Sequence, residues 1–170
     1  MSSNINIFED LENDVIEKEE DTIQMVSFLL SNGLYGIDIS DIREIINLSR
    51  ITYVPGSAEY IKGVMNVRGM VIPVVDLGKL LELPDIVFSD NTRIIIIEIS
   101  GQTTATGATC ATGATCKIGC LIDEVMDIVH ILPNKINPPP STLEKNKAKY
   151  IKGEVQIGEK LMAILELKNM

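Results

Sequence analysis

The stretch YIKGVMNVRGMVIPVVDL, from Tyr60 to Leu77, decides the fold of this chain. Apolar and β-branched residues stand on both sides of Asn66-Val67-Arg68-Gly69. Asn and Gly tolerate positive φ angles, so the pattern predicts a β-hairpin with its turn at these four residues. Pro73 has no N–H to donate, which predicts a second strand at a sheet edge or at a bulge. Arg68 would then lie at the hairpin tip, on the surface, with its donors free.

The same pattern returns near the C-terminus. The tetrapeptide YIKG at 60–63 recurs at 150–153, and VIPVVDL then aligns without a gap with LMAILEL at 161–167. Upstream, GIDISDIREII at 36–46 resembles GCLIDEVMDIV at 119–129. These matches predict two related β units in tandem, each too small to bury much core alone.

The two copies differ at the hairpin tip. Where the first copy has Asn66-Val67-Arg68-Gly69, the second has Gln156-Ile157-Gly158-Glu159. A feature needed only to fold the unit should be present in both copies. We therefore predict that the arginine at the first tip serves a function.

Composition and charge narrow the class of protein. The 170 residues fit one domain or two small ones, and 45% hydrophobic content is that of a globular protein. No apolar run approaches the roughly 18 to 20 residues of a spanning helix, and no signal peptide is recognisable, so a cytoplasmic location is expected. Of the net charge of −9, residues 1–21 carry −7 (eight acids, one Lys), which leaves −2 elsewhere. Without a basic face, no nucleic-acid partner is expected.

The N-terminal residues 1–22 are predicted to form a disordered acidic arm, because so dense a run of like charges is usually solvated. Phe8, Leu11 and Val15 would share one face if the arm became helical on a partner.

Two stretches suggest short helices. Ser40-Asp41 would cap a helix with Ile42, Ile45 and Ile46 inward and Glu44 outward. In the second copy, Asp123–Val129 has the same character. By contrast, Thr92–Ile99 predicts a strand buried on both faces.

The segment Thr103–Cys116 is anomalous. All fourteen letters are A, C, G or T, and ATGATC occurs twice in succession, at 105–110 and 111–116. We interpret it as nucleotide text, an artefact in the sequence, with a flexible surface loop as the alternative. Without it, two good strands would be joined by a tight hairpin. Two of the three cysteines lie in this segment, and only Cys120, predicted to be a buried small apolar residue, lies in ordinary sequence.

Catalytic chemistry has no support in the residue pattern. His130 is the only histidine and has apolar neighbours. Asp76 and Glu166 occupy matching places in the two copies, which favours a structural task such as capping a turn over an acid/base pair. No phosphate-binding glycine motif and no metal-ligand spacing is present, so we expect no cofactor and no enzyme activity. The sequence favours a protein that binds other proteins.

These residues together resemble the CheW family of coupling proteins in bacterial chemotaxis. YGIDISDIREII, ITYVP, YIKGVMNVRGMVIPVVDL and IGCLIDEVMDIV match the family pattern in order, across residues 24–168. The resemblance implies an all-β fold with short helices: two SH3-like five-stranded β-barrel subdomains packed together, with a hydrophobic groove between them. The expected CheW-like domain covers 23–168, with a first barrel at about 34–90 and a second at about 91–168. The strand at 24–31 is a candidate to cross over into the second barrel.

The resemblance also implies partners and site residues. Members bind the regulatory domain of the histidine kinase CheA and the cytoplasmic tip of methyl-accepting chemoreceptors. They act in the cytoplasm at membrane-anchored signalling arrays, without inserting into the membrane. The receptor-facing positions fall on Ile42, Glu44, Asn66, Arg68 and Gly69, while the kinase-binding residues are left open. The alternatives are that Ile42 is ordinary core, Glu44 a solvated helix face, and Asn66 and Gly69 turn formers.

The leading hypothesis is a non-enzymatic adaptor that couples receptor to kinase. A paralogue serving another chemosensory pathway, such as surface motility, would have the same features. A small-molecule-binding or enzymatic β-barrel that uses the groove is the hypothesis from a different class, and ligand-dependent thermal shifts would favour it. A regulatory piece of a kinase or of a receiver-fused coupling protein fits less well with the Met1 start and the absence of a receiver pattern.

Overall fold

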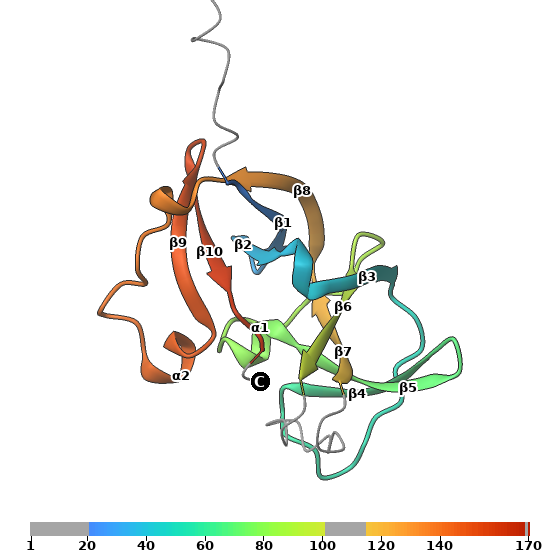
Figure 1. The fold of residues 1–170 in the computed structure, drawn as a ribbon. Coiled ribbons are helices and arrows are strands. Elements are labelled where there is room, and N and C mark those ends of the chain that lie inside the picture. The colour runs from blue at the N-terminus through green and yellow to red at the C-terminus, as the bar shows by residue number, and fades with distance from the viewer. Residues whose placement is uncertain (1–20, 101–114, 169) are drawn as a thin grey trace, which may run out of the picture.

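The computed structural model describes residues 21–100, 115–168 and 170. These residues are mostly β-strand, as predicted, with a few helical turns (Figure 1). The strands are β1 (Ile23–Leu30), β2 (Gly33–Asp38), β3 (Ile42–Asn47), β4 (Ile61–Val67), β5 (Met70–Asp76), β6 (Arg93–Ser100), β7 (Thr115–Ile122), β8 (Glu124–Ile131), β9 (Ile151–Ile157) and β10 (Lys160–Leu165). The helical turns are η1 (Ile39–Asp41), α1 (Leu77–Leu80), η2 (Pro133–Lys135) and α2 (Lys145–Ala148).

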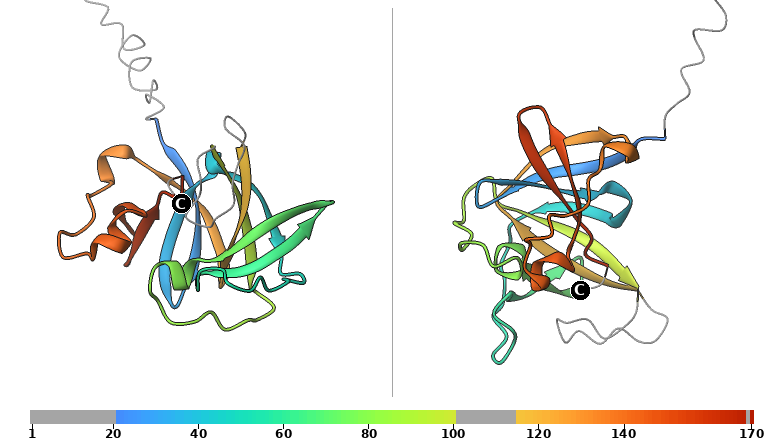
Figure 2. Two further views of the ribbon diagram at one scale, coloured as in Figure 1. Left: turned by 90° about the horizontal axis from the view of Figure 1, so that it is seen from below. Right: turned by 90° about the vertical axis from the view of Figure 1, so that its left-hand side faces the viewer.

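The described strands form two five-stranded sheets of the same design. One sheet has the order β8-β1-β2-β10-β9 and the other the order β3-β6-β7-β5-β4. Each contains one parallel pair, β2 with β10 in the first and β5 with β7 in the second. Each ends in a hairpin, β9–β10 or β4–β5, and the two hairpins lie on opposite sides of the molecule (Figure 2). The tandem duplication predicted from the sequence is therefore present in the fold.

The two copies exchange strands. Strands β1–β5 belong to the first copy and β6–β10 to the second, yet each sheet takes two strands from one copy and three from the other. The strand membership thus differs from the expected division at about residue 90. Strand β2 lies with β8–β10, while β6 and β7 lie with β3–β5; β1, the candidate for crossing over, pairs with β8. The expectation assumed that neighbours in sequence share a sheet, whereas η1 carries the chain from one sheet into the other.

Both predicted helices are wrong. After the single turn of η1, Ile42–Asn47 is strand β3, and Asp123–Val129 falls mainly on strand β8. In β3 the burial alternates, with Ile42, Glu44 and Ile46 half-buried and the residues between them exposed. Apolar residues at 42, 45 and 46 fit a helical spacing, but isoleucine is β-branched and packs well on a pleated surface. Ile42–Asn47 is a strand because it pairs with the buried strand β6.

Strand β6 forms the centre of the larger core. Ile94, Ile95, Ile96 and Ile97 are each no more than 2% exposed, so the strand is buried on both faces as predicted. Cys120 on β7 is also fully buried, and this burial raises the pKa of its thiol to about 12. A smaller core lies on the sheet that contains β1 and β8–β10; it consists of Met25, Ile131, Val155, Met162 and Ile164.

The anomalous segment lies mostly outside the described residues, as does the acidic arm. The exceptions are Thr115 and Cys116, which begin β7. Strands β6 and β7 pair antiparallel from Arg93–Ile122 to Ser100–Thr115, which is the hairpin pairing predicted on either side of the segment.

Candidate functional site

The tip of the β4–β5 hairpin is a two-residue turn at Arg68 and Gly69. Their φ angles are +50° and +85°, as in the turns whose twist matches that of a hairpin. The side-chain oxygen Oδ1 of Asn66 accepts a hydrogen bond from the Gly69 amide at 2.9 Å. Asn66 and Gly69 therefore shape the turn, whether or not they also contact a partner.

Arg68 occupies a position that suits glycine better. A non-glycine residue at positive φ is uncommon, and the aligned residue of the second copy is Gly158, with a φ of +58°. Positive φ was expected at Asn66 and Gly69; it occurs at Gly69 as expected and at Arg68 in place of Asn66. Strained residues of this kind tend to lie at functional sites.

Arg68 forms an ion pair with Glu44. Nη2 lies 2.8 Å from Oε2 of Glu44, and Nη1 lies 3.4 Å from Oε1. The expectation that the donors of Arg68 are free is therefore wrong. The arginine side chain is nevertheless 77% exposed, against 20% for Glu44. Two predicted site residues, Glu44 on β3 and Arg68 in the β4–β5 turn, thus form one charged pair at the surface.

A groove opens between β3 and β8, the edge strands of the two sheets. Its volume is about 420 Å³. One wall consists of Ile42, Arg43, Glu44 and Ile45, the other of Val125, Met126, Asp127 and Ile128, and Val26 and Ile39 complete the lining. The two walls are the same four positions of the two copies, by the alignment of GIDISDIREII with GCLIDEVMDIV. The internal duplication therefore builds the groove from two equivalent strands.

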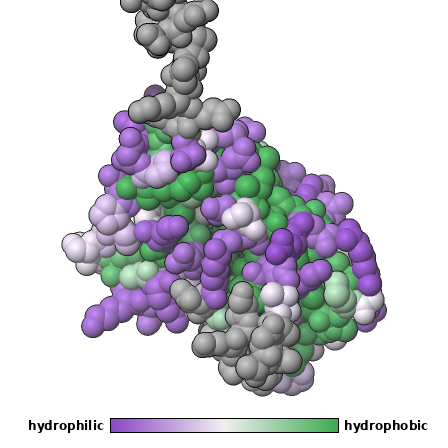
Figure 3. Space-filling view, viewed as in Figure 1, coloured by the Kyte–Doolittle hydropathy of each residue, from purple (hydrophilic) through white to green (hydrophobic). Residues whose placement is uncertain are grey.

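Large apolar side chains stand open to solvent in this groove. Ile45 is 39%, Met126 47% and Ile128 54% exposed. Ile42 both lines the groove and packs against the core. Figure 3 shows one face of the molecule, where apolar surface lies open beside strongly hydrophilic residues. Met126 and Ile128 were not predicted as site residues, because their strand was expected to be a helix; the repeat alignment pairs them with Arg43 and Ile45.

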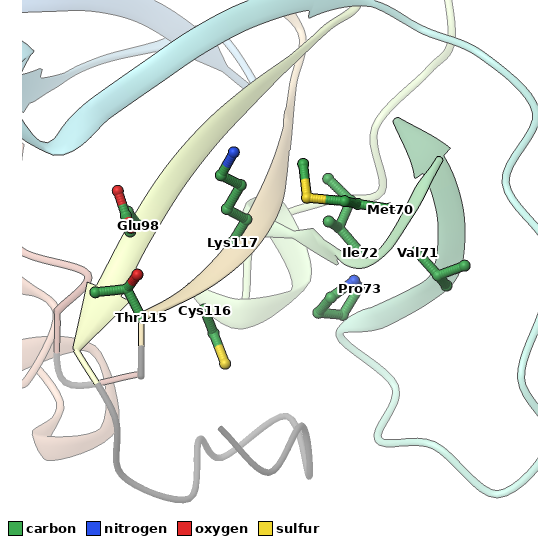
Figure 4. Close-up of a pocket in the computed structure, with 8 residues that line it drawn as sticks. All are labelled: Met70, Val71, Ile72, Pro73, Glu98, Thr115, Cys116 and Lys117. Carbon is green, nitrogen blue, oxygen red and sulfur yellow. The ribbon is translucent and has the colours of Figure 1, made fainter. Parts of the chain in front are cut away.

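A second hollow lies beside the hairpin. Strand β5 pairs with β7 only at Val74–Asp76, and the two strands are not paired at the preceding residues of β5. The space of about 510 Å³ has Met70, Val71, Ile72 and Pro73 on one side and Glu98, Thr115, Cys116 and Lys117 on the other (Figure 4). Pro73 predicted a strand at a sheet edge or at a bulge. Strand β5 is internal in the order of its sheet, and the β4–β5 ladder has a bulge between Ile61 and Gly63, next to the pair Val64–Pro73. The proline is accommodated because it precedes the first pair with β7.

Charged side chains connect β3 to this hollow. Arg43 forms an ion pair with Glu98 of β6. Hydrogen bonds from Thr115 and Arg43 hold the pKa of the Glu98 carboxyl below its usual range. The arrangement is a cross-strand ion pair that the Thr115 hydroxyl joins through its hydrogen bond to Glu98.

Asp76 and His130 both form side-chain contacts within the fold. Asp76 is fully buried, and its Oδ1 accepts a hydrogen bond from the Lys79 amide at 3.1 Å, so it caps α1 as predicted. Its other oxygen lies 3.5 Å from Nζ of Lys62. His130 is exposed on β8 and lies within 3.0 Å of the side-chain amide of Gln24. Among the described residues, no group of His, Cys, Asp and Glu is arranged to hold a metal ion. In the same part of the chain, the helices are too short or too polar to cross a membrane.

Comparison with known proteins gives a consistent result. The model of the CheW-like domain matches residues 24–170. The chain is 30% identical to the chemotaxis protein CheW of Bacillus subtilis, over 84% of this chain and 83% of that protein. It is 25% identical to the chemotaxis protein CheW of Klebsiella aerogenes, over 86% and 80%. The crystal structure of the scaffolding protein TtCheW from Thermoanaerobacter tengcongensis superimposes with a TM-score of 0.73 at 31% identity, covering 89% of this chain and 88% of that chain.

Proposed function

The chain belongs to the CheW-like domain family of non-enzymatic chemotaxis adaptors, and from this premise we propose that it couples methyl-accepting chemoreceptors to the histidine kinase CheA. It would do so in the cytoplasm, at membrane-anchored receptor arrays. The receptor would contact the groove between β3 and β8 and the hairpin tip beside it. The kinase regulatory domain would bind another surface, whose residues we leave unassigned.

The observation that carries this proposal is the conformation of Arg68. The first copy accepts an arginine at φ +50° where the second copy has a glycine, and this side chain stays 77% exposed. An exposed ion pair stabilises a fold by only about 0.2 to 1 kcal/mol, which is small beside the cost of a strained backbone of about 1 to 3 kcal/mol. Binding a partner accounts for the arginine better than folding does.

The groove supports a helical segment as the bound partner. Its floor and walls offer Ile45, Met126 and Ile128 to the apolar face of such a helix. Arg68 and Glu44 lie at one side, where a guanidinium can donate to a carboxylate or to a backbone carbonyl of the partner. Apolar contact would give area, and the charged pair would give register and orientation.

A pulldown tests the proposal. The full chain is immobilised and offered a chemoreceptor cytoplasmic fragment and, separately, the CheA regulatory domain. We expect both to be retained, and Ile45→Asp to lose the receptor fragment while keeping the kinase domain. Retention of neither partner would refute the proposal, and retention of receptors from another chemosensory pathway would identify a paralogue.

A further inference from the structure

Strand β8 contains a bulge where it lines the groove. Along the β1–β8 ladder, Val26 pairs with Ile128 and Phe28 with Val125. Two residues of β8, Met126 and Asp127, therefore oppose the single residue Ser27 of β1. A bulge leaves backbone groups without ladder partners and turns side chains in a new direction, and bulges are enriched beside functional sites.

The hydroxyl of Ser27 takes the place of the missing ladder bonds. Its Oγ donates to the carbonyl oxygen of Asp127 at 2.8 Å and accepts from the Asp127 amide at 3.1 Å. Ser27 is only 3% exposed whereas Asp127 is exposed, so the two bonds are partly buried. Buried backbone groups without a partner are costly, and this one side chain satisfies both groups of Asp127.

The first copy shows that such a hydroxyl is not a general need of the fold. Strand β3 has the equivalent irregularity, since Ile42 pairs with Ile97 and Glu44 with Ile96. By these registers, Ile96 is the counterpart of Ser27 and has no hydroxyl. The side chains at the two bulges also differ, because Arg43 pairs with Glu98 while its counterpart Met126 lies 47% exposed in the groove.

We propose that Ser27 is a positioning residue for the groove: its buried hydroxyl fixes the bulge of β8 and thereby holds Met126 toward the bound partner. The identity of the bound partner rests on the function proposed above. The effect of Ser27 on the β8 bulge concerns the free protein and can be tested without a partner. It assigns a role to a residue of β1 that contributes through Asp127 and Met126.

Ser27→Ala tests the proposal in two assays on the full chain. In the free protein, hydrogen exchange of the Asp127 amide should become about tenfold faster, since two partly buried hydrogen bonds to Asp127 are lost. Binding of a chemoreceptor cytoplasmic fragment, measured by calorimetry, should weaken about fivefold, as expected for a disturbed apolar contact. Ser27→Thr keeps the hydroxyl and should restore slow exchange.

Two controls separate positioning from general destabilisation. Thr92 is 1% exposed and accepts a hydrogen bond from the Ser89 amide outside the groove, so Thr92→Val also removes a buried hydroxyl. It should lower the stability while leaving receptor affinity and Asp127 exchange unchanged. In a Met126→Ala background, Ser27→Ala should alter receptor affinity less than about twofold, because the side chain through which it acts is absent.

Unchanged exchange of the Asp127 amide in Ser27→Ala would overturn the proposal. So would a loss of receptor affinity on adding Ser27→Ala to Met126→Ala that is as large as the loss caused by Ser27→Ala alone. If the wild-type chain does not bind the receptor fragment, the proposed function fails. The positioning claim is then decided by Asp127 exchange and by the Met126 methyl resonance, which Ser27→Ala should shift. Should Ser27→Ala not fold, Ser27→Cys, with only a weak donor, should change both in the same direction.

Discussion

Replacing Arg68 by glutamate converts the ion pair at the hairpin tip into two facing carboxylates. The charged atoms lie 2.8 Å apart, but Arg68 is 77% exposed, so water screens the change. Unit charges about 4 Å apart in water interact by about 1 kcal/mol, and exposed pairs contribute about 0.2 to 1 kcal/mol. We therefore expect Arg68→Glu to lower the free energy of unfolding by no more than about 2 kcal/mol, measured by chemical denaturation.

The same substitution should affect receptor binding far more. An arginine that anchors an interface commonly contributes about 2 kcal/mol or more, which is about a 30-fold change in affinity. Calorimetry with a chemoreceptor fragment should show at least this loss for Arg68→Glu. Binding to the CheA regulatory domain should be unchanged, and receptor control of kinase activity should be lost.

The charge-swapped double variant Glu44→Arg with Arg68→Glu is the control. It restores an ion pair and should recover stability, but it places the guanidinium on β3 and should not recover receptor affinity. Receptor binding by Arg68→Glu with wild-type affinity would refute the functional assignment of this residue. A loss of affinity no larger than the loss of stability would point to folding alone.

The fold and its charges give three further predictions. Gly63→Ala should lower stability by more than about 2 kcal/mol in thermal denaturation, because φ is +142° and a Cβ would collide with a backbone carbonyl of the neighbouring loop. Asp76→Ala should lower stability by about 1 to 3 kcal/mol in urea denaturation, because it removes a buried cap and counter-ion. Hydrogen bonds from Thr115 and Arg43 hold the pKa of Glu98 low, so Arg43→Ala should raise this pKa in an NMR titration. A pKa lowered on folding stabilises above the unfolded value, and this stabilisation is lost as pH falls through the folded value.

The sequence predicted the features that depend on local chemistry. The hairpin, the tandem duplication and the surface position of Arg68 followed from turn residues and from an internal repeat. The cap at Asp76 and the buried Cys120 followed from their neighbours. In each case a short stretch contains the residues that decide the structure.

The features that the sequence did not predict depend on contacts between distant segments. The exchange of strands between copies is set by pairing of β1 with β8 and of β6 with β3, more than forty residues apart in sequence. The same pairing makes strands of Ile42–Asn47 and Glu124–Ile131, whose apolar spacing also fits a helix. The ion pair between Arg68 and Glu44 forms because β3 and the β4–β5 hairpin belong to one sheet.

The most direct test of the account asks whether one molecule of this chain bridges two partners. An immobilised chemoreceptor fragment is mixed with the CheA regulatory domain, with the chain present or absent, and the retained kinase domain is measured. We predict retention only when the chain is present, and loss of retention with Arg68→Glu. Equal retention of the kinase domain without the chain, or no retention with it, would contradict the account.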